Sequence, residues 1–151
     1  MIVLQYQTEI GELVAATGTT CPPKGSKVRE IEAWRWVFNP ATSQCFLPVA
    51  VRNPKKLLQL NEPSQKCSAW GLSMHTSKEH SIAAFHALEE HFDRIRKVIG
   101  THVAVGKLSA AHGVATHADN YGHFDLHPKV SAPFNTTFVV EADPIPEFPD
   151  D

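Results

Sequence analysis

The sequence has few cysteines, little excess charge of either sign and no long apolar run. No stretch approaches the roughly 20 apolar residues of a transmembrane helix, which excludes a membrane-spanning protein. Cys21, Cys45 and Cys67 are odd in number, widely spaced and lack a C-x-x-C pair, so they predict neither a disulfide framework nor a zinc knuckle. A net charge of -2 argues against a surface built for polyanions, and nucleic acid is therefore not an expected partner.

The composition is that of an ordinary globular domain. The 151 residues are 42% hydrophobic and 20% charged. A chain of this length can bury roughly 68–70% of its unfolded surface, which is enough for a core without a structural metal. The N-terminus lacks the basic and apolar regions of a signal peptide. Together with the cysteine pattern, this predicts a cytoplasmic protein with reduced thiols.

Three segments differ in composition. Residues 1–32 begin with an apolar alternation and continue into a turn-rich stretch, and they predict an N-terminal arm or edge strand. Residues 33–142 predict a single α+β domain. Residues 143–151 are acidic and rich in proline, which cannot donate a backbone hydrogen bond, and they predict a tail.

Residues 77–99 predict one long amphipathic helix. Thr76 to Glu79 form an S/T-x-x-E capping box, with the Thr76 hydroxyl as the predicted cap. Gly100 is predicted to supply the left-handed position after the last turn. The apolar stripe repeats at steps of three and four residues and consists of Phe85, Leu88, Phe92, Ile95 and Ile99.

The remaining segments predict many short strands and one short helix. The helix is expected at 54–60, and the strands at 33–38, 46–51, 68–74, 102–105, 107–109, 123–126 and 136–142. The strands at 33–38 and 46–51 are expected to pair as a hairpin. Because strands and helices do not alternate, we expect the α+β class, with a mainly antiparallel sheet packed against the long helix.

Histidine is the anomaly of this sequence. There are nine, and four of them, His112, His117, His123 and His127, fall in one short stretch with Asp119 and Asp125. In an extended strand, the period of two places His123, Asp125 and His127 on one face. Phe124 and Leu126 then lie on the other face, where we expect them to anchor the core.

These histidines and aspartates predict a ligand site. Imidazole and carboxylate together suit a divalent transition metal such as zinc, manganese or iron, so His117, His123, Asp125 and His127 are candidate ligands. His123, Asp125 and His127 are also candidate acid and base groups of a hydrolytic enzyme. The competing interpretation is that all of them are surface residues of turns and strands, held by local hydrogen bonds.

A second pattern involves Arg35 in a strand, Ser73 in a strand that precedes a helix, and Glu141 at the end of Phe-Val-Val-Glu. This order resembles the Arg–Ser–Glu arrangement of small ADP-ribosyltransferases. The resemblance implies NAD as cofactor, with Arg35 on the dinucleotide phosphates and Ser73 supporting the nicotinamide pocket. Glu141 would stabilise an oxocarbenium-like transition state.

Three functional hypotheses stay open at this point. The first is a small intracellular domain with a His/Asp-lined site for a small molecule or metal, hydrolytic if it is an enzyme. The second is an NAD-dependent transferase that uses Arg35, Ser73 and Glu141. The third is a non-catalytic module that binds a protein partner through its proline-rich arm or acidic tail.

Overall fold

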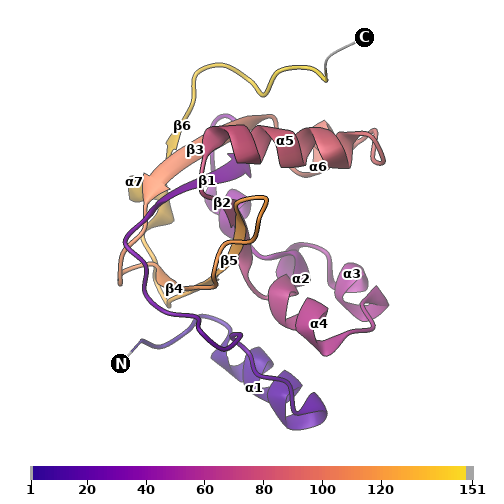
Figure 1. Cartoon of the computed structure of the whole chain (residues 1–151), viewed down its shortest axis with the longest axis vertical. Helices are drawn as coiled ribbons and strands as arrows, with labels where there is room; N and C mark the ends of the chain where they lie inside the picture. Colours follow the sequence, from indigo (N-terminus) through magenta and orange to yellow (C-terminus); the bar gives the residue numbers. More distant parts are fainter. Residues whose placement is uncertain (1, 149–151) are drawn as a thin grey trace.

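The computed structural model describes residues 2–148 and has an α+β fold with one six-stranded antiparallel sheet (Figure 1). The class and the antiparallel sheet are therefore confirmed. The strands are β1 (Glu32–Val37), β2 (Leu72–His75), β3 (His102–Lys107), β4 (Gly113–Ala115), β5 (His123–Pro128) and β6 (Val139–Val140). The helices are α1 (Gln7–Thr17), η1 (Ser43–Phe46), α2 (Val49–Arg52), α3 (Pro54–Gln59), α4 (Pro63–Ala69), α5 (Lys78–Glu89), α6 (Ile95–Val98) and α7 (Phe134–Thr137).

The sheet divides into two halves at its centre. Its strand order is β4-β5-β2-β1-β3-β6. β1 pairs with β3 from Glu32↔Lys107 to Val37↔His102, whereas β1 and β2 share only the pair Trp34↔His75. Beyond that pair the two central strands are not joined by a ladder, and the halves β4-β5-β2 and β1-β3-β6 are visible as separate groups in Figure 1.

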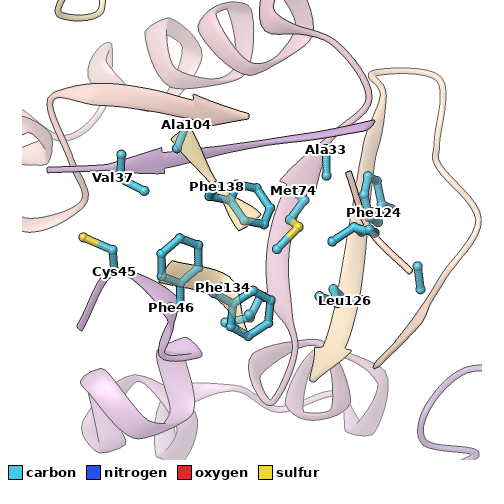
Figure 2. Packing of buried hydrophobic residues seen from close by; sticks show 13 residues of the cluster. Ala33, Val37, Cys45, Phe46, Met74, Ala104, Phe124, Leu126, Phe134 and Phe138 are labelled. Atoms are coloured by element: carbon cyan, nitrogen blue, oxygen red, sulfur yellow. The ribbon is translucent and has the colours of Figure 1, made fainter. Parts of the chain in front are cut away.

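A large apolar cluster covers one face of the sheet. It joins Met74, Phe124 and Leu126 from the strands to Phe46 of η1 and Phe134 of α7 (Figure 2). The Phe46 and Phe134 rings are stacked with centroids 5.1 Å apart. Phe124 and Leu126 are each 1% exposed, which confirms their predicted role as core anchors.

A smaller cluster lies on the opposite face, under α5. Phe85 of α5 and Val103 of β3 are buried there, and Trp34 and Trp36 of β1 pack against them. The Trp36 indole N–H donates to the carbonyl of Ser81 at 2.9 Å, which fixes α5 on the sheet. Arg35, between the two tryptophans, contacts the other side through Cys45.

The prediction of a single helix over 77–99 is wrong. α5 ends at Glu89 and α6 begins at Ile95. Between them the N–H of His91 donates to the carbonyl of Leu88 and that of Ile95 to the carbonyl of Phe92, three residues back instead of four, so the α-helical pattern is interrupted. Phe92 is 59% exposed and does not belong to the apolar face. Three helices, α1, α4 and α5, have seven or more residues.

Gly100 has a packing role instead of a left-handed one. It is absent from the glycines with positive φ among the described residues. A Cβ at this position would lie 2.8 Å from the carbonyl oxygen of Val37. The missing side chain therefore allows the chain after α6 to approach β1 closely, which a periodicity argument does not detect.

The N-terminal segment contains a helix and an isolated bridge. Its residues 7–17 form α1, whose Ile10 is 2% exposed, and only Leu4 makes an isolated bridge, to Lys129. Cys21 and Cys67 form a disulfide that ties the chain after α1 to α4, while Cys45 is free and buried. The prediction of unpaired cysteines is therefore wrong, because spacing in sequence does not show which cysteines meet in the fold. Disulfides persist mainly in oxidising compartments, and the cytoplasmic location stays a prediction.

Three predicted strands contain helices. The segment 46–51 includes the end of η1 and most of α2, the segment 68–74 includes the end of α4, and α7 occupies the start of 136–142. Pro63 at the first position of α4 explains one of these differences, because its fixed φ suits a helix start. The short helix expected at 54–60 is confirmed as α3, which also begins with proline.

The described part of the acidic segment, residues 143–148, packs on the fold. Ile145 is 3% exposed and belongs to the cluster under α5. Arg96 donates to the carbonyls of Ile145 and Pro146. Two backbone carbonyls of this proline-rich segment thus accept from one side chain, although its prolines cannot donate to a ladder. Among residues 2–148, no helix combines the length and apolarity that crossing a membrane requires.

The cap of α5 can be tested with two adjacent hydroxyl residues. The N-cap is Ser77, whose Oγ accepts from the N–H of His80 at 3.1 Å, and not Thr76 as the capping box suggests. We expect Ser77→Ala to lower the free energy of unfolding by about 1 kcal/mol. Thr76→Ala is the matched control and should change it by less than about 0.5 kcal/mol. Urea denaturation of the oxidised protein measures both, and equal losses would contradict this assignment.

Candidate functional site

A cavity of about 590 Å³ opens at the split between β1 and β2. This volume is within the roughly 300–1,000 Å³ of small-molecule sites. Segments from η1 to α3, α4 and the end of α6 complete its wall. Its charged and polar lining residues are Arg35, Arg52, Asn53, Lys56, Gln65, Ser68, Ser73, His123 and Asp125.

Arg35 is a buried cation at this cavity. Its guanidinium donates to the carbonyls of Cys45 at 2.9 Å and Ser73 at 2.7 Å, with a longer contact of 3.5 Å to Leu47. No carboxylate of the described residues forms an ion pair with it. Burial, together with the charge of Arg52, lowers the pKa of Arg35 to about 10, so the group stays charged at neutral pH. The carboxyl group of Asp125 acts in the opposite direction on this pKa, but it lies beyond ion-pair distance. A buried charge without a direct ion pair is costly, and such groups are frequent at functional sites.

Ser73 of β2 is hydrogen-bonded to His123 of β5, and Asp125 of β5 lies beside this pair. The strands align Ser73 with Asp125, and Ser73 Oγ lies 2.8 Å from His123 Nε2. The same nitrogen lies 3.6 Å from Asp125 Oδ1. Asp125 Oδ2 accepts from the hydroxyl of Ser68 on α4 at 2.7 Å. Burial raises the pKa of Asp125, although the Ser68 hydrogen bond acts in the opposite direction.

Asp119 approaches His123 from the turn before β5. Its Oδ1 accepts the N–H groups of Tyr121 and His123, which closes the turn. Its Oδ2 lies 4.0 Å from His123 Nδ1, a separation too long for a hydrogen bond. Burial alone would raise the pKa of Asp119, but the two N–H donors and the nearby His123 and His75 lower it. His123 therefore lies between two carboxyl groups, Asp119 and Asp125.

Two further cations lie at the rim of the cavity. Arg52 of α2 and Lys56 of α3 are exposed. Arg52 also donates to the carbonyl of Val98 at 2.6 Å, which holds α2 near α6. With Arg35 inside and these two residues outside, the cavity has a positive potential suited to an anionic ligand.

The predicted metal ligands are not brought together. His123 and Asp125 are neighbours at the cavity, but His117 is exposed near Gly25 and His127 packs beside Gly71. Among the described residues, no three of His117, His123, Asp125 and His127 have ligand atoms within 4.8 Å of one another. His127 does lie on β5, as the two-residue period suggests, but it lies two residues further along the strand than Asp125.

Of the three residues predicted to bind NAD, two lie together and one lies apart. Arg35 and Ser73 line one cavity and are joined by a hydrogen bond. Glu141 follows β6 at the other edge of the sheet, does not line the cavity, and binds Lys78 at 3.0 Å. The carboxylate beside Ser73 is that of Asp125.

His112 has a structural environment. It is 3% exposed, its Nδ1 accepts the N–H of Ser109, and its Nε2 lies 2.8 Å from the hydroxyl of Thr137. Burial lowers its pKa. With both ring nitrogens hydrogen-bonded, it links the turn before β4 to α7.

A different group of potential metal ligands is present. Cys21, Cys67 and His127 have ligand atoms that lie within 4.8 Å of one another, so a Cys/His group could hold a metal if the thiols were free. His127 is completely buried, and neither of its ring nitrogens has a hydrogen-bond partner. Burial lowers its pKa to about 4.

Sequence reasoning did not select several residues of the cavity. Ser68 lies on a segment expected to be a strand, and Lys56 and Gln65 lie on short helices. The basic residues of this segment are visible in the sequence, but nothing there shows that they surround one cavity. That information depends on the separation of β1 from β2.

The chain was compared with models of protein families, with curated proteins and with solved structures, and none of them matches it. Functional inference therefore depends on the geometry of the cavity.

The two most strongly shifted histidines predict a loss of stability in acid. Burial, with the nearby His123, lowers the pKa of His75 to about 4, and burial gives the same value for His127. Below pH 6.5 the unfolded chain binds protons that the folded chain excludes, so stability decreases as pH falls towards 4. Each histidine should contribute about 1.4 kcal/mol per pH unit in that interval.

His75→Phe should reduce this slope by one histidine's contribution while keeping an aromatic ring beside Trp36. Urea denaturation at several pH values between 4.5 and 7.5 measures the slope. An unchanged slope in the variant would show that His75 is not excluded from protonation in the folded protein.

Proposed function

We propose that this protein is an NAD-consuming enzyme that binds the dinucleotide in the cavity between β1 and β2 and transfers its ADP-ribose group. The observation that carries this proposal is the buried Arg35 guanidinium, which has no carboxylate partner among the described residues and lines a cavity of about 590 Å³. Arg35 and Ser73 are also two of the three residues that resemble the small ADP-ribosyltransferases.

The anionic part of NAD fits the charge of the cavity. Phosphate oxygens accept charge-assisted hydrogen bonds from guanidinium groups, whose planar fork is suited to them. Arg35 has five N–H donors, and the backbone carbonyls leave part of this set free for a ligand. Arg52 and Lys56 at the rim add attraction for a second phosphate. A diphosphate would therefore supply the direct ion pair that Arg35 lacks among the described residues.

The reactive end of the ligand would lie near Ser73, His123 and Asp125. Transfer breaks the bond between ribose C1′ and the nicotinamide nitrogen, and the bonding electrons leave with nicotinamide. Positive charge develops on the ribose, and a nearby carboxylate stabilises it. Asp125 has that position here and takes the role that the sequence pattern gave to Glu141. The oxygen of an acceptor hydroxyl or water then bonds to C1′, and His123 accepts its proton.

A second candidate is a serine hydrolase. Ser73 Oγ lies 2.8 Å from His123 Nε2, and Asp119 Oδ2 lies 4.0 Å from His123 Nδ1. This arrangement has the order of a nucleophile, a base and an orienting carboxylate. It differs from the transferase in one respect that can be tested, because Ser73 itself would form a covalent intermediate.

Ligand binding can be tested with two adjacent lysines of α3. Lys56 lines the cavity, whereas Lys55 is exposed and does not. We expect Lys56→Ala to weaken ADP-ribose binding about fivefold, equivalent to about 1 kcal/mol, and Lys55→Ala to change it less than about twofold. Isothermal titration calorimetry at low ionic strength measures both. Equal effects would mean that the lysines act only through net charge, and no binding to the unmodified protein would exclude the proposed ligand.

The choice of carboxylate is tested by turnover of NAD. Asp125→Asn should lower the rate of nicotinamide release by at least about 100-fold, because it removes the charge that stabilises the transition state. Glu141→Gln is the comparison variant and should retain at least about half of the rate, since Glu141 binds Lys78 outside the cavity. Chromatographic detection of nicotinamide gives the rates.

The reverse result, with Glu141 essential and Asp125 dispensable, would contradict this assignment. If neither variant changes the rate of nicotinamide release but a fluorophosphonate labels Ser73, the hydrolase is favoured.

The Asp125→Asn variant should remain folded and gain stability at neutral pH. The pKa of the Asp125 carboxyl is raised in the folded protein, so its ionised form destabilises the fold above that pKa. The asparagine removes this penalty, and the gain in stability disappears as the pH falls and the wild-type carboxyl becomes protonated.

A further inference from the structure

The group formed by Cys21, Cys67 and His127 lies outside the proposed NAD cavity. Cys21 follows α1, Cys67 is in α4 and His127 is in β5. None of the three lines the cavity. The disulfide explains why the two cysteines are close, but it does not explain a histidine buried beside them.

His127 is the least satisfied histidine of the described residues. Its side chain is completely buried, and it is the only histidine there whose two ring nitrogens are both buried without a hydrogen-bond partner. Burial of an imidazole without a hydrogen bond is unfavourable, because the ring nitrogens lose their hydrogen bonds to water and gain none in the protein. One of these nitrogens and the two sulfur atoms lie within 4.8 Å of one another. An added Cβ at Gly71 would lie 3.3 Å from Cε1 of His127, so the absence of a side chain there leaves space for the ring.

We propose that, when its disulfide is reduced, this protein binds one zinc ion through Cys21, Cys67 and His127. Two thiolates and one imidazole are ligands that zinc prefers, and three protein ligands leave a fourth tetrahedral position for water. The buried ring nitrogen of His127 gains the partner that it lacks in the oxidised protein. Zinc and the disulfide use the same sulfur atoms, so the two states exclude each other.

An external dithiol is the reductant of the Cys21–Cys67 disulfide. The dithiol gives two electrons and two protons to the Cys21–Cys67 bond, which becomes two thiols, while the dithiol itself becomes a disulfide. Binding of Zn²⁺ to the two sulfur atoms then releases both thiol protons to solvent. The ring nitrogen of His127 donates its lone pair to the metal.

Cobalt(II) titration of the reduced full-length protein tests this site. Cobalt replaces zinc and gives thiolate-to-metal charge-transfer absorption, which an oxygen or nitrogen site does not give. We expect one equivalent of Co²⁺ to produce this absorption and one equivalent of Zn²⁺ to abolish it. The oxidised protein should give none. Zinc should also raise the melting temperature of the reduced protein only.

Three variants separate this site from unspecific thiol binding. Cys21→Ser and His127→Gln each remove one ligand and should weaken cobalt binding at least about tenfold. Cys45→Ala removes the free buried cysteine and should leave binding unchanged. Circular dichroism checks folding. If His127→Gln does not fold, Cys21→Ser decides, because Cys21 is only partly buried.

Absence of charge-transfer absorption in the reduced protein would overturn the proposal, as would equal binding in the Cys45→Ala and Cys21→Ser variants. Neither outcome bears on NAD, because the measurement uses metal alone and residues that do not line the cavity.

Discussion

The structure depends on how Arg35 joins the two halves of the sheet. β1 and β2 share one ladder pair, and beyond it the Arg35 guanidinium takes the place of the missing strand hydrogen bonds by donating to the carbonyl of Ser73. The same group donates to Cys45 and thereby holds η1 against the sheet. One charged side chain thus connects β1 to β2 and to η1 where the two strands do not form a ladder. An apolar residue would fill the space but would leave these carbonyls without partners.

Several ionisable groups near the cavity are buried, and burial disfavours their charged forms. Three such groups lie near the centre of the sheet: the Arg35 cation, which has no direct ion pair, the carboxyl of Asp125 with its raised pKa, and His75 with its lowered pKa. Each group is destabilised by burial, and none is needed to fill the core, which the phenylalanines of the opposite face supply. Proteins retain such groups where a ligand relieves the penalty. The cavity therefore has the physical features of a site for a ligand with an anionic part.

The sequence predicted local features better than it predicted assembly. The period of two in β5 predicted Phe124 and Leu126 as core residues, and Pro54 marked a true helix start. The helix over 77–99 failed because an apolar stripe continues through Phe92 although the backbone leaves the helix there. Arg35 and Ser73 were selected from the sequence, but Ser68 and Lys56 reach the same cavity only through tertiary packing. The same limit applies to the disulfide, whose cysteines are 46 residues apart.

The cavity and the Cys/His group are separate sites on shared elements. α4 carries Cys67 next to Ser68, and Ser68 binds the carboxyl of Asp125. β5 carries Asp125 and His127 two residues apart, so both residues lie on the same face of the strand. Ser68 is also the residue whose hydrogen bond opposes the raised pKa of Asp125. The disulfide and the carboxyl group of the cavity are therefore linked by one peptide bond and one hydrogen bond.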